Sequence, residues 1–409
     1  MIGLTRTAPR RERLGLPAPG RWQRERRRTR PVKVAMIGQK GLPATFGGVE
    51  RHVEELGSRL VAEGVEVTVY CRANYSMSGE GMPEYYKGMH LVTTPTVASK
   101  HLDAIVHSLT STVHAIRSGH DVIHYHALGP GLVAPVARYA SRAKVVLTVH
   151  GMDHERAKWS RPARTILGLA HWMSGHVPDA VVTVSRALAE HYESTFGVDA
   201  AYIPNGVATP TPGPLPERFV RDYGLRPGGY VLFVGRIVPE KRPDLLVEAL
   251  AELPADVKVA IVGDSSFSDE YVDRLREDGL RDPRVVFPGY VYGPELGALY
   301  SNAAVFVQPS DLEGLPLTLL EAVSYGLPVV ASDIAPHREV LDACTCGAHR
   351  MFRAGDASDL AAALCGALED LEQSRRRAAR ESEELLLPYR WSTAVSELAE
   401  LYRKITGRQ

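Results

Sequence analysis

Two glutamates in the second half of the chain have a spacing suited to binding sugar hydroxyls. Glu313 and Glu321 are separated by seven residues, in the segment EGLPLTLLE. Glu313 falls in the loop after a predicted strand, whereas Glu321 falls inside an otherwise apolar predicted helix. A carboxylate on such a helix costs several kcal/mol unless a partner pairs with it or hydrogen-bonds to it. Hydroxyls of a sugar or a ribose would satisfy it; the alternative is a helix cap followed by a surface glutamate.

Two cations follow a different predicted strand, in the segment GRIVPEK. Arg236 lies at the carboxyl end of that strand, and Lys241 lies at the start of the next helix. Cations at these places could neutralise a diphosphate. An exposed pair of this kind is often only solvated surface, but its position at the strand end favours a binding site.

A glycine-rich segment, residues 38–48, joins the first predicted strand to the first predicted helix. Backbone N–H groups at such a junction can point at an anion. The glycines do not match the dinucleotide-binding fingerprint, and no P-loop sequence follows them. Gly47 and Gly48 directly precede the helix, which favours a phosphate or acceptor contact over a simple tight turn.

Histidines gather at two predicted strand ends. His150 follows the strand 144–149 and is expected to face a ligand, while His124 and His126 lie on a neighbouring strand and His154 is close in sequence. The pattern raises the possibility of a zinc site. Because no acidic or cysteine ligand is spaced to complete it, we predict no metal. His124 or His126 is then expected to be a buried imidazole with satisfied hydrogen bonds.

These residues must be positioned by alternating strands and helices. Short apolar runs predict strands near residues 32–37, 65–70, 91–94, 122–126, 145–149, 181–184, 231–234, 257–262, 285–287, 304–308 and 328–332. Near-continuous apolar strands that alternate with amphipathic helices indicate parallel sheets covered on both faces. The proline-rich segment 209–216 interrupts the alternation and is predicted to link two domains.

The predicted fold class is α/β, with two doubly wound, Rossmann-like domains that face a central cleft. Ligands of open α/β sheets bind at the carboxyl ends of the strands. The predicted domain boundaries are a disordered basic arm 1–31, an N-terminal domain 32–208, the linker 209–216, a C-terminal domain 217–388 and a final helical segment 389–409.

The charge distribution excludes one class of partner. Lysine and arginine together number 48, as do aspartate and glutamate. The arm alone carries ten arginines against two glutamates, so the rest of the chain is mildly acidic. A nucleic-acid-binding domain needs a basic face on the fold itself, and we therefore expect no nucleic-acid partner.

The sequence also indicates where in the cell the protein is located. The sequence contains no apolar run long enough to span a membrane and no secretory signal, so we expect a cytoplasmic protein. The basic arm could contact anionic lipid at the inner face of the plasma membrane. A start codon assigned too far upstream is the alternative explanation of the arm.

Several segments resemble the GT-B retaining glycosyltransferases of family four, also described as glycosyltransferase group 1. VGRIVPEKRPDLLVEAL (234–250) resembles the opening of the family's second domain, and EGLPLTLLEAVSYGLPVVAS (313–332) matches its E-x7-E signature. The stretch 36–72 is similar to a subgroup of polysaccharide and rhamnosyl-type transferases. The resemblance covers roughly residues 32–405.

The resemblance implies a hexosyltransferase that moves a hexose-type sugar from a nucleotide-diphosphate sugar to a hydroxyl acceptor. That acceptor would be a glycan, a lipid-linked glycan or a small molecule in cell-envelope or polysaccharide biosynthesis. The first domain would bind the acceptor and the second the nucleotide sugar, and the final helix would cross back onto the first domain. The resemblance implies no cofactor, since the nucleotide sugar is a substrate.

Residue roles follow from the same resemblance. Arg236 and Lys241 would bind the diphosphate and stabilise the charge of the leaving group, and Glu313 and His150 would contact the transferred sugar. The resemblance thus implies four catalytic residues. The expected substrate-binding residues are Gly47, Gly48, Tyr290, Val291, Gly314, Leu315, Pro316, Leu317 and Glu321. Leu315 departs from the phenylalanine of many members, and Ala335–Pro336 replaces a common Gly–Gly pair. These departures leave the sugar preference open.

Two alternatives stay open at this level. The chain could be a non-catalytic nucleotide-sugar-binding partner of another transferase, or a GT-B nucleotide-sugar epimerase. The epimerases lack the paired Arg-x4-Lys and E-x7-E patterns, which favours a transferase.

Overall fold

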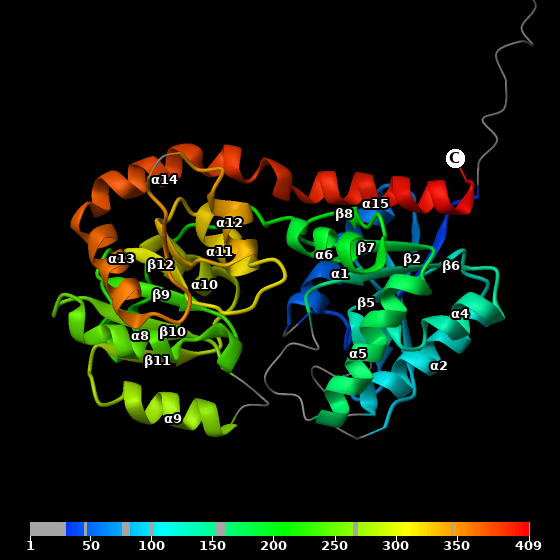
Figure 1. Cartoon of the computed structure of the whole chain (residues 1–409), viewed down its shortest axis with the longest axis horizontal. Coiled ribbons are helices and arrows are strands. Elements are labelled where there is room, and N and C mark those ends of the chain that lie inside the picture. Colours follow the sequence, from blue (N-terminus) through cyan, green and yellow to red (C-terminus); the bar gives the residue numbers. More distant parts are fainter. Residues whose placement is uncertain are drawn as a thin grey trace, which may run out of the picture.

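The chain folds into two lobes, each built on a mainly parallel sheet with helices packed around it (Figure 1). The computed structural model describes residues 30–44, 47–75, 82–97, 102–152, 161–264, 269–345 and 347–408. Residues 1–29 of the predicted basic arm lie outside the described residues.

Within the described residues of the first lobe, one sheet contains β1 (Lys33–Ile37), β2 (Glu66–Arg72), β3 (Tyr85–Tyr86), β4 (Met89–Thr94), β5 (Val122–His126), β6 (Lys144–Val149), β7 (Ala180–Thr183) and β8 (Ala201–Tyr202). The spatial order is β3-β4-β2-β1-β5-β6-β7-β8. Only the pair β3–β4 is antiparallel among these described strands. The central strand β5 is buried along its whole length, as a strand covered on both faces must be.

In the described part of the second lobe, the sheet contains β9 (Tyr230–Val234), β10 (Lys258–Val262), β11 (Val285–Gly289), β12 (Val305–Gln308), β13 (Val329–Ser332) and β14 (Arg350–Phe352). The order is β11-β10-β9-β12-β13-β14, with parallel pairing throughout these strands. The order reverses beside β9, and the carboxyl ends of β9 and β12 therefore border a crevice suited to a ligand.

Helices connect the strands in both lobes. Those of the first lobe are α1 (Gly48–Ala62), α2 (Asp103–Arg117), α3 (Leu128–Gly131), α4 (Ala134–Ala140), α5 (Arg161–His176) and α6 (Arg186–Phe196). Those that follow are α7 (Glu217–Tyr223), α8 (Asp244–Ala249), α9 (Asp269–Gly279), α10 (Gly293–Asn302), α11 (Leu317–Ser324), α12 (Ala335–Leu341), α13 (Ala357–Glu369), α14 (Leu371–Leu385) and α15 (Trp391–Thr406).

Local sequence sets the ends of several helices. The Ser185 hydroxyl accepts a hydrogen bond from the backbone N–H of Leu188 at the start of α6, and Gly197 ends that helix in the left-handed conformation. The Asp356 carboxylate caps α13 in the same way. Side-chain caps of this type stabilise a helix by about 1 kcal/mol.

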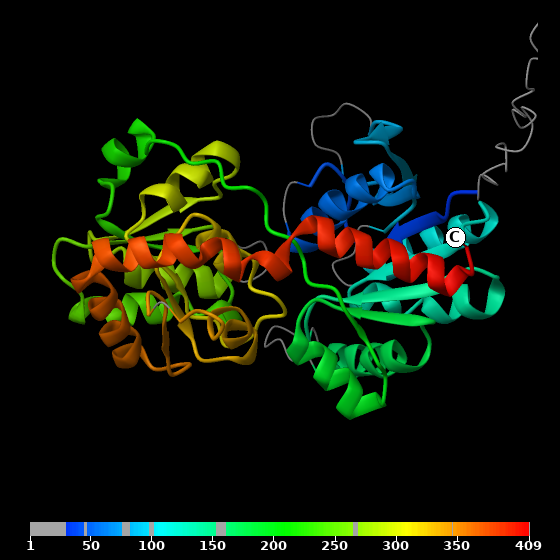
Figure 2. The same ribbon diagram turned by 90° about the horizontal axis from the view of Figure 1, so that it is seen from above.

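The last two helices join the lobes. Seen from above, α14 and α15 run one after the other across both of them (Figure 2). Trp391, Val395 and Leu398 of α15 belong to the same buried apolar cluster as Val53 and Leu56 of α1. The C-terminal helix therefore completes the core of the N-terminal lobe.

Candidate functional site

A pocket lies where strand ends from the two lobes meet. It is lined by His150, Gly151, Met152, Arg236, Glu240, Lys241, Leu312, Glu313, Gly314 and Leu315. His150 directly follows β6, Arg236 follows β9, and the loop carrying Glu313 follows β12. The fold thus brings together the side chains that the sequence singles out as catalytic, namely Arg236, Lys241, Glu313 and His150.

Glu313 is held by a network of donors. Its Oε1 accepts hydrogen bonds from Lys241 Nζ (2.7 Å), Gln308 Nε2 (2.6 Å) and Ser310 Oγ (2.7 Å). Thr318 Oγ1 donates to Gln308 Oε1 at 3.0 Å, which orients that amide. Burial disfavours the charged form, but Lys241, His337 and the Ser310 hydroxyl together outweigh it, and the pKa of Glu313 lies below its ordinary value. Glu313 is therefore an ionised, fixed carboxylate.

Arg236 and Lys241 enter the pocket from one short segment. Lys241 ends a 3-10 turn, Pro239–Lys241, that follows the strand β9. A side chain at Gly235 would begin 3.2 Å from Lys241 Cδ, so the glycine leaves room for the lysine stem. Both cations line the pocket beside Glu313, where an anionic group of a ligand would be attracted.

The loop that leads into α11 packs against the first lobe. A Cβ at Gly314 would lie 1.9 Å from the backbone oxygen of His150, so only glycine allows this approach. Leu315 is buried, and Pro316 precedes Leu317, the first residue of α11. A Cβ at Gly48 would lie 3.8 Å from Leu317 Cδ1, which places the start of α1 opposite the start of α11.

Gly47 shapes the entry to α1. Its φ of 99° favours glycine, and the Glu50 carboxylate lies beside it. Glu50 Oε1 also accepts a hydrogen bond from the backbone N–H of Lys40 at 3.0 Å. The glycine pair predicted to contact phosphate or acceptor is thus exposed at the cleft side of the first lobe.

Glu321 has partners from both lobes. Its Oε1 lies 3.1 Å from Arg51 Nη1 of α1, and its Oε2 accepts a hydrogen bond from Tyr300 Oη at 3.1 Å. Burial raises the pKa of Glu321, and these two partners oppose the shift only in part. This buried carboxylate can accept more hydrogen bonds than its two partners supply, for example from ligand hydroxyls.

Tyr290 and Val291 lie at the carboxyl end of the edge strand β11. Tyr290 is exposed and stacks on Tyr292, with ring centroids 5.9 Å apart, whereas Val291 is buried. Neither residue lines the pocket around Glu313. The pair lies at the same edge of the sheet as Arg236, further along it.

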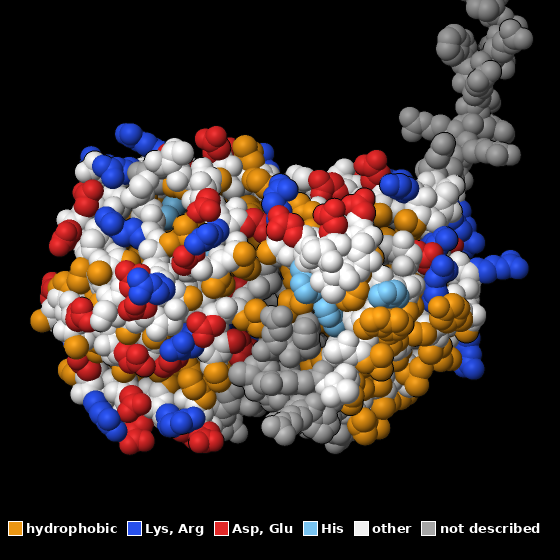
Figure 3. All heavy atoms as spheres, viewed as in Figure 1, with side chains coloured by type: hydrophobic (Ala, Val, Ile, Leu, Met, Phe, Trp, Pro, Cys, Tyr) orange, Lys and Arg blue, Asp and Glu red, His pale blue; other side chains and the backbone are white. Residues whose placement is uncertain are grey.

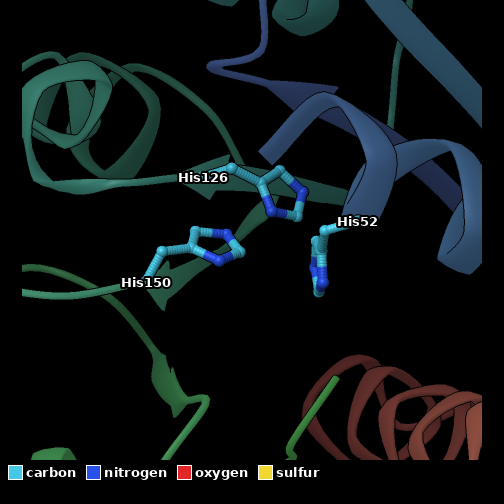
Figure 4. Close-up of side chains that lie close together, drawn as sticks. All are labelled: His52, His126 and His150. Atoms are coloured by element: carbon cyan, nitrogen blue, oxygen red, sulfur yellow. The ribbon is translucent and has the colours of Figure 1, made fainter. Parts of the chain in front are cut away.

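The histidines have two different environments. His124 Nδ1 lies 2.6 Å from Tyr402 Oη, and its Nε2 lies 2.7 Å from Thr148 Oγ1, so His124 is the satisfied buried imidazole. Neither ring nitrogen of His126 has a hydrogen-bond partner among the described residues. A third imidazole, that of His52 on α1, lies beside those of His126 and His150 (Figure 4). His154 lies outside the described residues.

Sequence reasoning missed two charged residues at the site. Glu240 lines the pocket, and its two carboxylate oxygens are buried without a hydrogen-bond partner in the described part of the chain. Glu240 directly precedes Lys241 in the sequence, and this position could have identified it as a site residue. Arg51 was missed because its partner Glu321 is 270 positions away in the other lobe, and no local pattern reports such a contact.

Comparison with known proteins identifies the family. A model described as Glycosyltransferase Family 4 matches residues 46–210, and one described as Glycosyl transferases group 1 matches residues 228–370. A relative from Mycolicibacterium smegmatis is 32% identical over 398 residues, which cover 90% of this chain and 97% of that protein. It is named GDP-mannose-dependent alpha-(1-6)-phosphatidylinositol monomannoside mannosyltransferase. The chain belongs to glycosyltransferase family 4.

Other similar proteins agree with this. The family 4 glycosyltransferase is 31% identical to the D-inositol 3-phosphate glycosyltransferase of Pseudarthrobacter chlorophenolicus, over 70% of this chain and 74% of that one. Among solved structures, HepE of Anabaena in complex with UDP and glucose has a TM-score of 0.75 at 18% identity, covering 91% of this chain and 100% of that chain. Sucrose-phosphate synthase of Thermosynechococcus elongatus has a TM-score of 0.75 at 23% identity, covering 92% and 99%. The predicted family, GT-B fold and glycosyltransferase activity are confirmed.

Proposed function

We propose that this family 4 glycosyltransferase moves a hexose-type sugar from a nucleoside-diphosphate sugar to a hydroxyl acceptor, with retention of anomeric configuration. The observation that carries the proposal is the pocket between the lobes. It sets Arg236 and Lys241 beside the ionised Glu313, with His150 entering from the opposite lobe. Cations fit a diphosphate, and a carboxylate with an imidazole fits the hydroxyls of a sugar.

We assign the remaining substrate contacts to residues around this pocket. Glu321 takes the ribose hydroxyls, and Tyr290 with Val291 borders the base at the end of β11. Gly47 and Gly48 face the acceptor side. The names of similar proteins support a nucleotide-sugar donor, since one relative is GDP-mannose-dependent and HepE was solved with UDP and glucose.

Charge stabilisation accounts for the chemistry. Negative charge would develop on the departing diphosphate, which Arg236 and Lys241 of the pocket would stabilise. The N-terminus of α11, two residues after the pocket-lining Leu315, would add a favourable helix dipole. A same-face attack, in which the leaving phosphate takes the acceptor proton, retains configuration without a protein nucleophile. Because the protein supplies these cations, we expect transfer without an added divalent metal.

An acceptor in the cell envelope is supported by one surface. Within the described residues, no helix is long and apolar enough to cross a bilayer. Ile166, Leu169 and Trp172 of α5 are nevertheless about half exposed, and Leu109 and Tyr139 are exposed on neighbouring helices. Figure 3 shows hydrophobic side chains gathered over this part of the first lobe. Such a surface suits peripheral contact with a membrane that presents a lipid-linked acceptor, and co-sedimentation with anionic vesicles tests it.

The first experiment identifies the nucleotide. Melting temperatures are measured with UDP, GDP, ADP and dTDP, with NAD as the negative control. A ligand at 100 times its dissociation constant adds about 2.7 kcal/mol of stability, which gives a visible shift. We expect one diphosphate to stabilise the wild type and to lose this effect in Glu321→Ala. No shift with any of them would contradict the donor assignment.

The second experiment tests transfer itself. The sugars of the identified nucleotide are assayed with glycan, lipid and inositol-phosphate acceptors, and the anomeric configuration of the product is read by NMR. Arg236→Ala should lower the rate by about 10²–10³-fold, the range typical of lost charge stabilisation, with an unchanged melting temperature. A fully active variant, or a product of inverted configuration, would contradict this mechanism.

A further inference from the structure

Three imidazoles from separate elements converge beside the pocket. His52 comes from α1, His126 from the end of β5, and His150 from the loop after β6 (Figure 4). One ring nitrogen of each lies within 4.8 Å of those of the other two. We infer that His52, His126 and His150 form a binding site for a divalent transition-metal ion of the zinc type.

The second contact of His52 prepares it as a ligand. Its Nδ1 lies 2.6 Å from the amide oxygen of the buried Asn205. An amide oxygen only accepts, so Nδ1 carries the proton and Nε2 presents its lone pair. Metal-ligating histidines almost always have such a partner, which fixes the tautomer and the ring orientation.

Three ring nitrogens of His52 and His126 have no hydrogen-bond partner among the described residues. They are His52 Nε2 and both nitrogens of His126, and all three are buried. Most buried polar atoms in native proteins have a partner; a metal ion would provide one for His52 Nε2 and for one nitrogen of His126.

The donor set restricts the ion. Imidazole nitrogens suit Zn²⁺, Co²⁺, Ni²⁺ and Cu²⁺, whereas Mg²⁺ and Ca²⁺ require oxygen ligands. With Zn–N bonds of about 2.0–2.1 Å, the nitrogens of a tetrahedral site lie roughly 3.4 Å apart. The ring nitrogens, which lie within 4.8 Å of one another, must therefore move closer by up to about 1.4 Å. Three protein ligands leave one position open for water or a ligand group.

A metal ion in this site would prevent His150 from contacting the proposed donor sugar. His150 also lines the pocket of the proposed donor sugar, and a metal bound to its ring would hold it among the histidines. The ion should therefore inhibit transfer. This second part rests on the proposed function, whereas metal binding does not.

The test is a titration of the full-length protein with Co²⁺ and Zn²⁺. Visible absorption reports the cobalt, because tetrahedral nitrogen ligation gives far stronger bands than hydrated Co²⁺, and calorimetry reports the zinc. We expect one ion per chain in the wild type. His52→Ala should lose the intense bands and weaken Zn²⁺ binding at least 100-fold, and Asn205→Ala should weaken it about 10–100-fold, the usual cost of removing a ligand's hydrogen-bond partner.

A second histidine pair provides the control. His171 and His191 lie with their Nε2 atoms 3.0 Å apart on α5 and α6, and His191→Ala removes that pair without touching the proposed site. Binding that is lost in His191→Ala but kept in His52→Ala would overturn the inference, as would no binding in the wild type. A cooperative thermal unfolding transition, measured without metal or nucleotide, verifies that each variant is folded.

The inhibition is measured against each protein's own metal-free rate. We expect stoichiometric Zn²⁺ to lower sugar transfer by the wild type but not by His52→Ala. Equal inhibition of both would overturn the link to His150. Metal binding without any transferase activity would instead contradict the proposed function and leave the site standing.

Discussion

Glu321 is a buried carboxylate whose partners come from both lobes. Burial raises its pKa above the ordinary value of 4.5, although Arg51 and Tyr300 oppose the shift. A raised pKa means that ionisation costs stability. The cost is absent well below the ordinary pKa, and it grows as the pH rises until the raised pKa is passed.

Replacement of this carboxylate should therefore stabilise the protein in a pH-dependent way. Glu321→Gln keeps an acceptor for the Tyr300 hydroxyl and removes the buried charge, so we expect a higher melting temperature than wild type at about pH 8 and a smaller gain at about pH 5. Scanning fluorimetry at both values measures this, with the exposed Glu277→Gln as control. An equal gain at both pH values would contradict the explanation, and nucleotide affinity should fall.

Lys241 and Glu313 form the most enclosed ion pair of the pocket, with side chains only 16% and 10% exposed. Removal of one partner of such a pair leaves an uncompensated charge. We expect Lys241→Met to cost about 3 kcal/mol and Lys241→Met with Glu313→Gln to recover most of it. Urea unfolding followed by fluorescence measures both. If the double variant is as unstable as the single one, the charge is not the cause.

Residue spacing predicted one part of the site and not another. Arg236, Lys241 and Glu313 were identified because each follows a strand of the same sheet, so sequence order fixes where it lies. His52, Arg51 and Glu240 were not. The partners of His52 and Arg51 come from distant elements, and a single sequence records no such pairing.

The helix α15 packs into the N-terminal lobe, although it follows the C-terminal lobe in the sequence. Trp391 is 8% exposed within the core of the N-terminal lobe, and a Cβ at Gly206 would lie 2.4 Å from its ring. We expect Trp391→Ala to destabilise the protein by about 3–5 kcal/mol. Thermal unfolding measures the loss, with the exposed Leu387→Ala as the matched control. Equal effects of the two changes would contradict the role of α15.

The predicted elements were found where the hydrophobic pattern is strong. Central strands such as β5 and β9 are buried along their length and were predicted from their apolar runs. The edge strands β3, β8 and β14 are two or three residues long and partly exposed. They form because a neighbouring strand offers free backbone groups, and their own side chains carry no periodic signal.

For the whole molecule, Arg51 and Glu321 join the lobes across the proposed donor site. Because Arg51 is 53% exposed, the ion pair contributes at most about 1 kcal/mol. Ribose hydroxyls that bind Glu321, as proposed, would compete with Arg51 for the same carboxylate. We expect Arg51→Ala to tighten nucleoside-diphosphate binding up to about fivefold, the equivalent of that energy.

Calorimetry with the identified nucleotide measures this effect. Arg59→Ala is the control, because Arg59 pairs with Glu55 of its own helix, away from the other lobe. Weaker binding in Arg51→Ala would mean that Arg51 contacts the nucleotide itself.

The position of α15 also has a consequence for biosynthesis. A ribosome releases the strands of the first lobe long before it makes residues 391–406, yet Val395, Leu398 and Tyr402 fill that lobe's core. The half that is translated first is thus completed last. Until then its unfinished apolar face is exposed to other nascent chains and to chaperones. The second lobe, whose sheet is translated later, has all its strands before the first lobe is closed.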